Sequence, residues 1–471
     1  MGSALGDPRR NRRAVRVVEK LARNPTLSVP QALGSDAEVQ GCYRLMSNEQ
    51  VTFEALHGAH AAGTRARAQA ACRVLVLHDT TPCTFEHVDP EELGYLSTGQ
   101  AGFHLHYGLV LAGDVWKRPL GVIHAETGHR RDKPSPGRPG RGKKKKKKSG
   151  AETAQQTCKE YDRWWRGLSS AHQLLSDVDA IHIADRESDS YELMAQAIEQ
   201  GIRFIFRSRT DRRGRRADNA SNFWSTVRQI ARGCEGVLER EVPLSRRRSD
   251  GPPAQAKAHP PRKMRLAKLR FAATRVVIPR PQYLTDSVPR CLELSLVHVA
   301  EVEPPDGEPP VEWLLYTTEA VDKPEQITDV VDCYRARWTI EEFNAALKTG
   351  CAYESREFES RHALLNMLAL SLPIACECLW LRSRARSTPD APASDVVSTV
   401  QLQVLRHFSS YKMPPEPTAV DALLAVAALG GHLRRNGPPG WKVLLAGMAL
   451  LHAHTAGWQA ALAQAARHTN L

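Results

Sequence analysis

Short apolar runs of strand type, alternating with helical stretches, constrain the fold of this chain more than any other feature of its sequence. Val74 to Leu77 is one such run and leads into His78-Asp79-Thr80-Thr81, and Ala180 to Ala184 is another and ends at Asp185. A helical pattern over 190–199 follows the second run. Similar runs cover 105–111, 115–124 and 203–207. Strands mixed with helices in this order predict an α/β fold built on a mixed sheet.

The first 70 residues have a different texture and predict a small all-helical domain. Val15, Val18 and Leu21 mark the apolar face of its opening helix. The other faces carry Arg9, Arg10, Arg12, Arg13 and Arg16. Asp7 and Glu19 are the only acids nearby, so these arginines cannot all pair internally. We therefore expect residues 1–70 to bind DNA through its phosphates.

Composition divides the rest of the chain. Residues 71–370 form the expected α/β core, and 371–471 the expected C-terminal helical domain. That domain has more apolar helical surface than a basic tail needs, at Leu423, Leu424, Val426, Leu429, Leu444, Leu445 and Leu450. Residues 134–150 contain six consecutive lysines, 143–148, and this self-repelling stretch is expected to be a disordered basic loop. Residues 210–310 alternate basic clusters with short strand-like runs such as 292–299, and are expected to form a β-rich insertion.

The charge balance favours a polyanionic partner. Lys and Arg number 65 against 52 Asp and Glu, which gives a net charge of +13. A soluble protein that is merely basic is the alternative. The longest clean apolar run, Ala422 to Gly431, is too short to cross a membrane, and we expect no membrane partner. The scattered cysteines include no C-x-x-C pair, which indicates neither a zinc site nor a disulfide scaffold and fits the cytoplasm.

Asp79 and Asp185 are candidate ligands for a metal ion. Each follows an apolar strand, and the carboxyl ends of strands are where α/β sheets place their ligand sites. Two neighbouring carboxylates repel each other, and Mg²⁺ relieves that repulsion because it prefers carboxylate oxygens. Taken alone, each aspartate is better explained as a turn or cap residue.

A helical stretch, YRARWTIEEFNAALK over 334–348, supplies a third candidate. Tyr334, Arg337, Glu341 and Lys348 are separated by about one, one and two helical turns, so all four are expected on one face. A surface ladder of ion pairs produces the same spacing. Glu342 is a rival for the ligand role, but it points about 100° away from Glu341 around the helix.

These residues resemble the DDE transposases of bacterial insertion sequences, and the closest branch is the insertion-sequence-four family. The resemblance rests on Asp79 in HDTT, Asp185 in DRESDSYEL and the Tyr-Arg-Glu-Lys signature. ALGDPRRNRRAVRV, GCYRLMSN and ALGGHLRRNGPPGW add to it, so that it covers most of the chain. The resemblance implies a ribonuclease-H-like core with a β insertion, an N-terminal DNA-binding domain and a C-terminal dimerisation region.

The resemblance also assigns roles to individual residues. Asp79, Asp185 and Glu341 would be catalytic and would hold two Mg²⁺ or Mn²⁺ ions. Tyr334, Arg337 and Lys348 would contact phosphates of the transposon end. Trp313, 21 residues before Tyr334, matches a Trp that stacks where the DNA is distorted. Arg207, in FRSR, matches an Arg near a flipped base, and Arg209 in the same stretch is also expected to bind DNA. The lysine run matches nothing in the family pattern.

The implied activity is cut-and-paste transposition. Water would cleave one strand at the transposon end, the freed 3′-hydroxyl would attack the opposite strand to form a hairpin, and the opened end would join target DNA. The partners would be double-stranded DNA and a second copy of the chain, at the bacterial nucleoid. A catalytically silent DNA-binding relative and a non-transposing nuclease on the same fold are the alternatives.

Overall fold

A single large sheet carries the structure, which is a computed structural model and describes residues 5–23, 25–86, 88–114, 117–130, 150–218, 224–244, 262–285, 287–433, 435, 437 and 439–469. Within these residues the sheet has eleven strands in the order β3-β2-β1-β4-β5-β11-β10-β9-β6-β7, with β8 paired to β9. The pairs β1–β4 and β4–β5 are parallel and the others are antiparallel. The expected mixed α/β architecture is therefore present.

The strands are β1 Val74–Thr84, β2 Gly102–Ala112, β3 Pro119–Gly128, β4 Ala180–Ala184, β5 Arg203–Arg207, β6 Arg213–Arg216, β7 Ser225–Thr226, β8 Leu238–Leu244, β9 Arg265–Pro279, β10 Cys291–Glu301 and β11 Glu312–Thr317. Eight helices precede the last strand, β11, in the described residues. They are α1 Pro8–Arg23, α2 Val29–Leu33, α3 Asp36–Met46, α4 Phe53–Gln69, α5 Pro90–Leu93, α6 Gly150–Leu174, α7 Tyr191–Glu199 and α8 Val227–Arg232. The helices that follow β11 are α10 Pro324–Arg335, α11 Thr339–Ala345, α12 Arg361–Ser387, α13 Thr399–Phe408, α14 Ala419–Leu429 and α15 Trp441–Thr469. Short turns of helix fill the gaps at η1 Arg186–Ser188, η2 Ala336–Trp338, η3 Ala346–Gly350, η4 Tyr353–Ser355 and η5 Ala393–Asp395.

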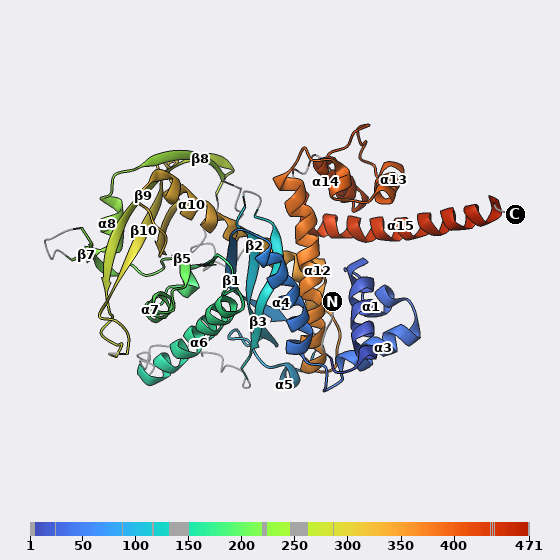
Figure 1. Cartoon of the computed structure of the whole chain (residues 1–471), viewed down its shortest axis with the longest axis horizontal. Coiled ribbons are helices and arrows are strands. Elements are labelled where there is room, and N and C mark those ends of the chain that lie inside the picture. Colours follow the sequence, from blue (N-terminus) through green and yellow to red (C-terminus); the bar gives the residue numbers. More distant parts are fainter. Residues whose placement is uncertain are drawn as a thin grey trace, which may run out of the picture.

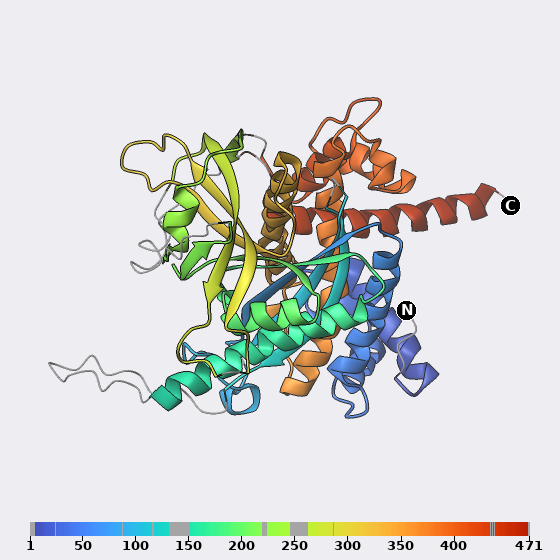
Figure 2. The same ribbon diagram turned by 60° about the vertical axis from the view of Figure 1, so that its left-hand side comes forward.

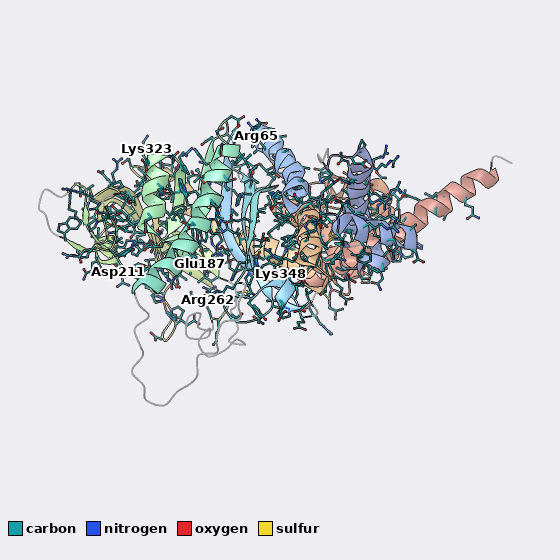
Figure 3. All side chains as sticks on the ribbon, turned by 90° about the horizontal axis from the view of Figure 1, so that it is seen from below. Arg65, Glu187, Asp211, Arg262, Lys323 and Lys348 are labelled. Atoms are coloured by element: carbon teal, nitrogen blue, oxygen red, sulfur yellow. The ribbon has the colours of Figure 1, made fainter. Side chains whose placement is uncertain are left out.

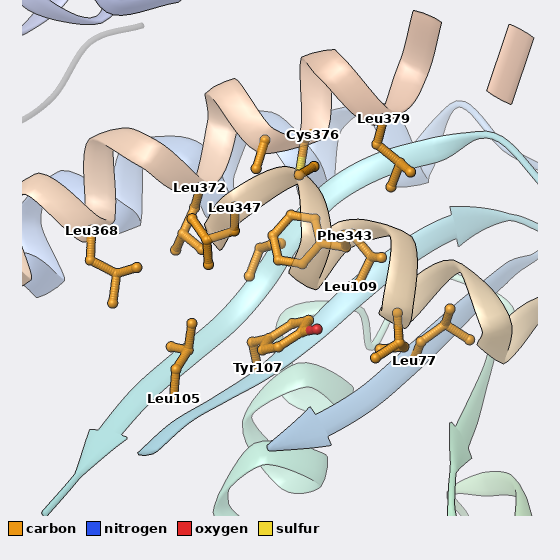
Figure 4. Close-up of a cluster of buried hydrophobic side chains, with 14 of the residues drawn as sticks. Leu77, Leu105, Tyr107, Leu109, Phe343, Leu347, Leu368, Leu372, Cys376 and Leu379 are labelled. Atoms are coloured by element: carbon orange, nitrogen blue, oxygen red, sulfur yellow. The ribbon is translucent and has the colours of Figure 1, made fainter. Parts of the chain in front are cut away.

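The strands β2 and β4 and the first half of β1 are buried on both faces, and successive side chains of each strand point to opposite faces. On β1, Leu75 and Leu77 join the cluster beneath α11 and α12, whereas Val74 and Val76 join a cluster with α4 and α6. Figure 4 shows the first of these clusters, in which Tyr107 of β2 lies beneath Phe343 of α11. This alternation assigns each strand residue near the site to one face or the other.

Buried histidines gather on the α4 and α6 side of the sheet. His78, His106 and His182 come from neighbouring strands, and His57 and His60 come from α4. His78 and His182 share a hydrogen bond of 2.9 Å, and His60 Nε2 accepts one of 3.0 Å from Val122 N. All five are less than 9% exposed. Burial lowers the pKa of His57 to about 4 and that of His60 and His78 to about 3, so these imidazoles are held neutral.

The first three helices form a compact unit that buried polar groups attach to the rest of the molecule. Arg356 is 5% exposed, and its guanidinium donates to Leu27 O at 2.5 Å, Pro25 O at 2.8 Å and Cys351 O at 2.8 Å. Asn366 of α12 donates to two further carbonyls, Met46 O and Val51 O. The fourth helix, α4, packs on β3 and α12 instead. The described part of residues 1–70 is thus helical, but its last helix, α4, packs against the central sheet and not with the first three helices.

The expected insertion continues the central sheet rather than forming a separate one. β9 and β10 pair along their length, β10 pairs with β11, and β11 pairs with β5 of the core. Figures 1 and 2 show these long strands extending one side of the molecule. The expected loop 134–150 lies outside the described residues except Gly150, the first residue of α6.

α12 packs on the same face of the sheet as α11. Because this helix continues past residue 370, the expected boundary between the core and the C-terminal domain falls inside it. Its stretch Arg361–Ala385 is long and apolar enough to cross a membrane, but 76% of the apolar window is buried within the protein. This stretch was not singled out from the sequence. Beyond it, α15 extends away from the other helices (Figures 1 and 2).

Candidate active site

Asp79 and Asp185 occupy matching positions on neighbouring strands. The parallel pairing of β1 with β4 ends at His78 opposite Ala184, and each aspartate is the next residue along its chain. The expectation that Asp79 ends its strand is wrong, because β1 continues to Thr84 through its antiparallel pairing with β2. The parallel pairing of β1 with β4 does end at His78 and Ala184, so Asp79 and Asp185 lie side by side just beyond it. Asp185 also caps the following turn, since its Oδ1 accepts from Glu187 N at 2.9 Å.

The stretch 334–348 is not one regular α-helix. Tyr334 lies at the end of α10, Arg337 in the 3₁₀ turn η2, Glu341 in α11 and Lys348 in the π turn η3. Sequence spacing alone could not detect these changes of helical pitch, which alter the angle between side chains. Arg337 and Glu341 still meet, with Nη2 to Oε1 at 2.7 Å.

Glu341 and its neighbour point to different surroundings. Glu341 Oε2 is buried and has no hydrogen-bond partner among the described residues. Glu342 Oε1 lies 3.7 Å from Nη2 of Arg382 in α12. The placement of Glu341, whose charge also acts on Asp79, favours it over Glu342 as a ligand.

The charges of Asp185 and Glu341 both act on the Asp79 carboxyl. Burial raises the pKa of Asp79 to about 7, the hydrogen bond from Asn344 opposes that rise, and the charges of Asp185 and Glu341 add to it. Among the described residues, no three His, Cys, Asp or Glu side chains stand close enough together to form a complete metal site as they are. The donor set nevertheless fits a divalent cation, because it combines hard carboxylate oxygens, mutual repulsion and the unpartnered Oε2 of Glu341.

Asn344 and Tyr107 contact this group, and neither was predicted from the sequence. Asn344 Nδ2 donates to Asp79 Oδ2 at 3.2 Å, and Tyr107 Oη donates to Asn344 Oδ1 at 2.8 Å. Asn344 stands three residues after Glu341, a spacing that brings two side chains together on a helix. That spacing was the available signal for Asn344, whereas nothing in the sequence marked Tyr107.

The remaining signature residues, Lys348, Tyr334 and Arg337, contact different parts of the protein. Lys348 Nζ donates to Pro82 O of β1 and lies 3.6 Å from Glu354 Oε1. In Figure 3, Lys348 and Glu187 are labelled near the middle of the long axis of the molecule. Tyr334 is 4% exposed, and its buried hydroxyl has no hydrogen-bond partner of normal geometry within the described part of the chain. Burial acts to lower the pKa of Arg337, but the charges of Glu341 and Tyr334 outweigh it and raise the pKa.

Trp313 is partly buried and connects Tyr334 with Arg207. Its ring packs edge-on against Tyr334 with centroids 5.4 Å apart, and the Arg207 guanidinium lies 5.8 Å from the Trp313 ring centre. Trp338, in contrast, is 62% exposed and is not part of the core.

Beside Trp313 lies a basic pocket of about 250 Å³, lined by Arg186, Arg207, Ser208, Arg209, Arg228, Pro310, Glu312 and Leu314. Glu312 accepts from Arg228 at 2.6 Å and from Arg232 at 3.0 Å, so it holds α8 of the insertion against β11. Arg207 and Arg209 were predicted from the sequence, whereas Arg186, Arg228 and Glu312 were not. Four arginines against one carboxylate make this pocket suitable for an anion.

The N-terminal arginines lie on α1, far along the chain from the carboxylates. Arg9, Arg12, Arg13 and Arg16 are exposed, whereas Arg10 is held by Leu5 O and Gln50 Oε1. Arg16 also lies 3.7 Å from Glu38. Four of the five therefore remain accessible to a polyanion.

Two family models match this sequence. Residues 1–51 match the model described as Transposase DNA-binding, and residues 145–375 match the one described as Transposase DDE domain. The first match covers α1 to α3, and the second contains Asp185 and Glu341 while beginning after Asp79. Together the two matches support a DDE transposase, a class of enzyme that acts on DNA and generally uses divalent metal ions.

Proposed function

We propose that this DDE transposase works by a cut-and-paste mechanism on an insertion sequence of the insertion-sequence-four type. It binds the terminal inverted repeats of the element, cleaves at their ends and joins them to target DNA. The observation that carries the proposal is the shared register of Asp79 and Asp185 beneath the helix that bears Glu341. The ribonuclease-H-like description of the core is part of the same proposal.

Asp79, Asp185 and Glu341 are the residues that would hold the metal, as two Mg²⁺ or Mn²⁺ ions. When bound, such ions lower the pKa of water and stabilise negative charge on phosphate oxygens. The support on the protein side is the raised pKa of Asp79, which burial causes first and the charges of Asp185 and Glu341 increase, together with the buried, unpartnered Oε2 of Glu341.

The cationic residues around the carboxylates bind and orient the DNA. Arg337 and Lys348 offer charge-assisted hydrogen bonds to phosphate oxygens, and Tyr334 offers a hydroxyl. Binding a phosphate requires Arg337 to share or release Glu341, with which it pairs at 2.7 Å. Arg337 therefore links the occupancy of the phosphate site to the freedom of a catalytic carboxylate.

Hairpin formation requires the second strand to bend sharply towards the freed 3′-hydroxyl, and Trp313 is the residue we assign to that distortion. A base stacked on an indole gains about 1 to 3 kcal/mol, which offsets part of the cost of unstacking it. The basic pocket beside Trp313, with Arg207 and Arg209, then holds the displaced nucleotide.

A second copy of the chain completes the proposed complex, because two transposon ends must be held together. The apolar residues expected to form that contact are largely used within the chain, since Leu423, Leu444 and Leu445 are buried. Leu450 and Leu462 of α15 are 42% and 53% exposed. We place the homodimer contact on this exposed part of α15, with the complex acting on DNA in the bacterial cytoplasm.

One experiment separates the proposal from its alternatives. The purified protein is incubated with end DNA of its own element and Mn²⁺, and nicked, hairpin and joined products are resolved on a gel. Asp79→Asn, Asp185→Asn and Glu341→Gln should abolish all three products while DNA binding survives. Nicking without joining would indicate a simple nuclease, and binding without any product from the wild type would indicate a silent relative.

A further inference from the structure

Two polar side chains connect the first candidate ligand to the helix that carries the third. We propose that Asn344 and Tyr107 form a positioning relay, in which Tyr107 fixes the amide of Asn344 and Asn344 orients the carboxylate of Asp79 for a divalent cation. This inference rests on the proposed function. The observed contacts are Tyr107 Oη to Asn344 Oδ1 at 2.8 Å and Asn344 Nδ2 to Asp79 Oδ2 at 3.2 Å.

The strand register brings the relay together. Tyr107 of β2 stands directly opposite Asp79 of β1, and residues opposite each other in an antiparallel pair point to the same face. That face lies beneath α11, whose Phe343 packs on the Tyr107 ring at 5.1 Å (Figure 4). Because Tyr107 is fully buried, its hydroxyl occupies a fixed position. The amide of Asn344 enters the space between the hydroxyl and the carboxylate.

The chemistry of the three groups gives the relay one direction. An ionised carboxylate can only accept hydrogen bonds, so it requires the amide nitrogen of Asn344. The amide oxygen then faces Tyr107, and the tyrosine hydroxyl donates to it. Each group therefore meets a complementary partner, and the bond to Asp79 leaves its carboxylate free to remain an anion, which is the form that binds a metal ion.

The relay also couples two candidate ligands that come from distant parts of the chain. Asn344 lies three residues after Glu341, so the two side chains are neighbours on α11. A hydrogen bond from Asn344 to Asp79 consequently fixes the position of α11, and of Glu341, relative to β1. A cation held between Asp79 and Glu341 requires a constant distance between their carboxylates.

A purely structural role is the competing explanation, since any buried hydrogen bond stabilises the fold. Tyr353 provides a matched control because it is equally buried and its hydroxyl donates to Leu364 O at 2.9 Å. Tyr353→Phe removes a bond of the same kind without touching Asp79. It should lower the melting temperature about as much as Tyr107→Phe does.

The test measures Mn²⁺ binding to the full-length protein by electron paramagnetic resonance of free Mn²⁺, which needs neither DNA nor turnover. Loss of a partner to a metal-bound group typically weakens affinity 10- to 100-fold, and we expect a loss in this range for Asn344→Leu. Tyr107→Phe should weaken binding less, and Tyr353→Phe should leave it unchanged. The double variant Tyr107→Phe/Asn344→Leu should bind no worse than Asn344→Leu alone, because the two residues act in series.

The outcomes distinguish the relay from the proposed function. If Asp79→Asn and Glu341→Gln lose Mn²⁺ binding but Asn344→Leu retains wild-type affinity, the relay is refuted and the metal site stands. If neither carboxylate variant changes Mn²⁺ binding, the metal assignment itself fails. Should Asn344→Leu not fold, Tyr107→Phe decides, because equal Mn²⁺ affinity in Tyr107→Phe and the wild type contradicts the relay.

Discussion

The buried histidines should make the protein sensitive to mild acid. His57, His60 and His78 have pKa values lowered to about 4, 3 and 3, whereas an unfolded chain protonates its histidines near pH 6.5. Their contribution to stability is fully present above pH 6.5 and is lost as the pH falls towards the folded pKa values. At pH 5.5 the loss is about 1.4 kcal/mol for each histidine, or about 4 kcal/mol for the three.

Asp79 opposes this trend. Its raised pKa of about 7 means that the folded protein protonates Asp79 before the unfolded chain does, so acidification relieves an unfavourable charge. This offsets about 2 kcal/mol between pH 7.5 and 5.5. For these four groups together, unfolding at pH 5.5 takes up roughly two protons, which contributes about 2.4 kcal/mol per pH unit to the slope, and the buried His106 and His182 make the slope steeper.

Urea unfolding without metal, followed by circular dichroism at pH 7.5, 6.5 and 5.5, measures that slope. His60→Gln keeps an acceptor for Val122 N but removes one titrating group, so its slope at pH 5.5 should fall by about 1.2 kcal/mol per pH unit. A His60→Gln slope equal to that of the wild type would refute the reasoning.

Three further predictions concern the N-terminal helices and Trp313. Arg356→Met should remove three buried hydrogen bonds and cost about 3 kcal/mol, and limited proteolysis should then release the first 51 residues faster than from the wild type. Replacing the exposed arginines of α1 by Gln should lower the salt slope of end binding by about 0.9 for each arginine that neutralises a phosphate, whereas Arg10→Gln, at an internally bonded position, should change it less. Trp313→Ala should slow hairpin formation while nicking stays near normal, and an abasic site in the DNA should partly rescue it; equal loss of both steps, with a lower melting temperature, would assign Trp313 to the core.

The sequence predicted the strands around the candidate site because each has a compact apolar run ending in polar residues. Asp79 and Asp185 were marked by those runs, and Glu341 by its helical spacing. The register that places the two aspartates side by side was not predictable, since it depends on pairing between segments about 100 residues apart. The same holds for Tyr107, an ordinary strand aromatic until β1 pairs with β2.

The helix 334–348 shows a different limit of sequence reasoning. A regular α-helix was expected, but the chain tightens at η2 and widens at η3, so the position of Lys348 could not be calculated from a rotation of about 100° per residue. The leucines of the tail show another limit. Apolar periodicity cannot distinguish a surface that packs within the chain from one that meets a second copy, and Leu444 and Leu445 pack within it.

The order of strands in the sheet has a consequence for the growing chain on the ribosome. β5 ends at Arg207, but its partner β11 begins only at Glu312, after the whole insertion. At about 5 to 20 residues per second, roughly 5 to 20 seconds pass between the synthesis of the two strands. During that interval one edge of β5 exposes unpaired backbone groups, which invite pairing with other chains. Synthesis of the insertion therefore sets the time for which the nascent enzyme is most exposed to aggregation.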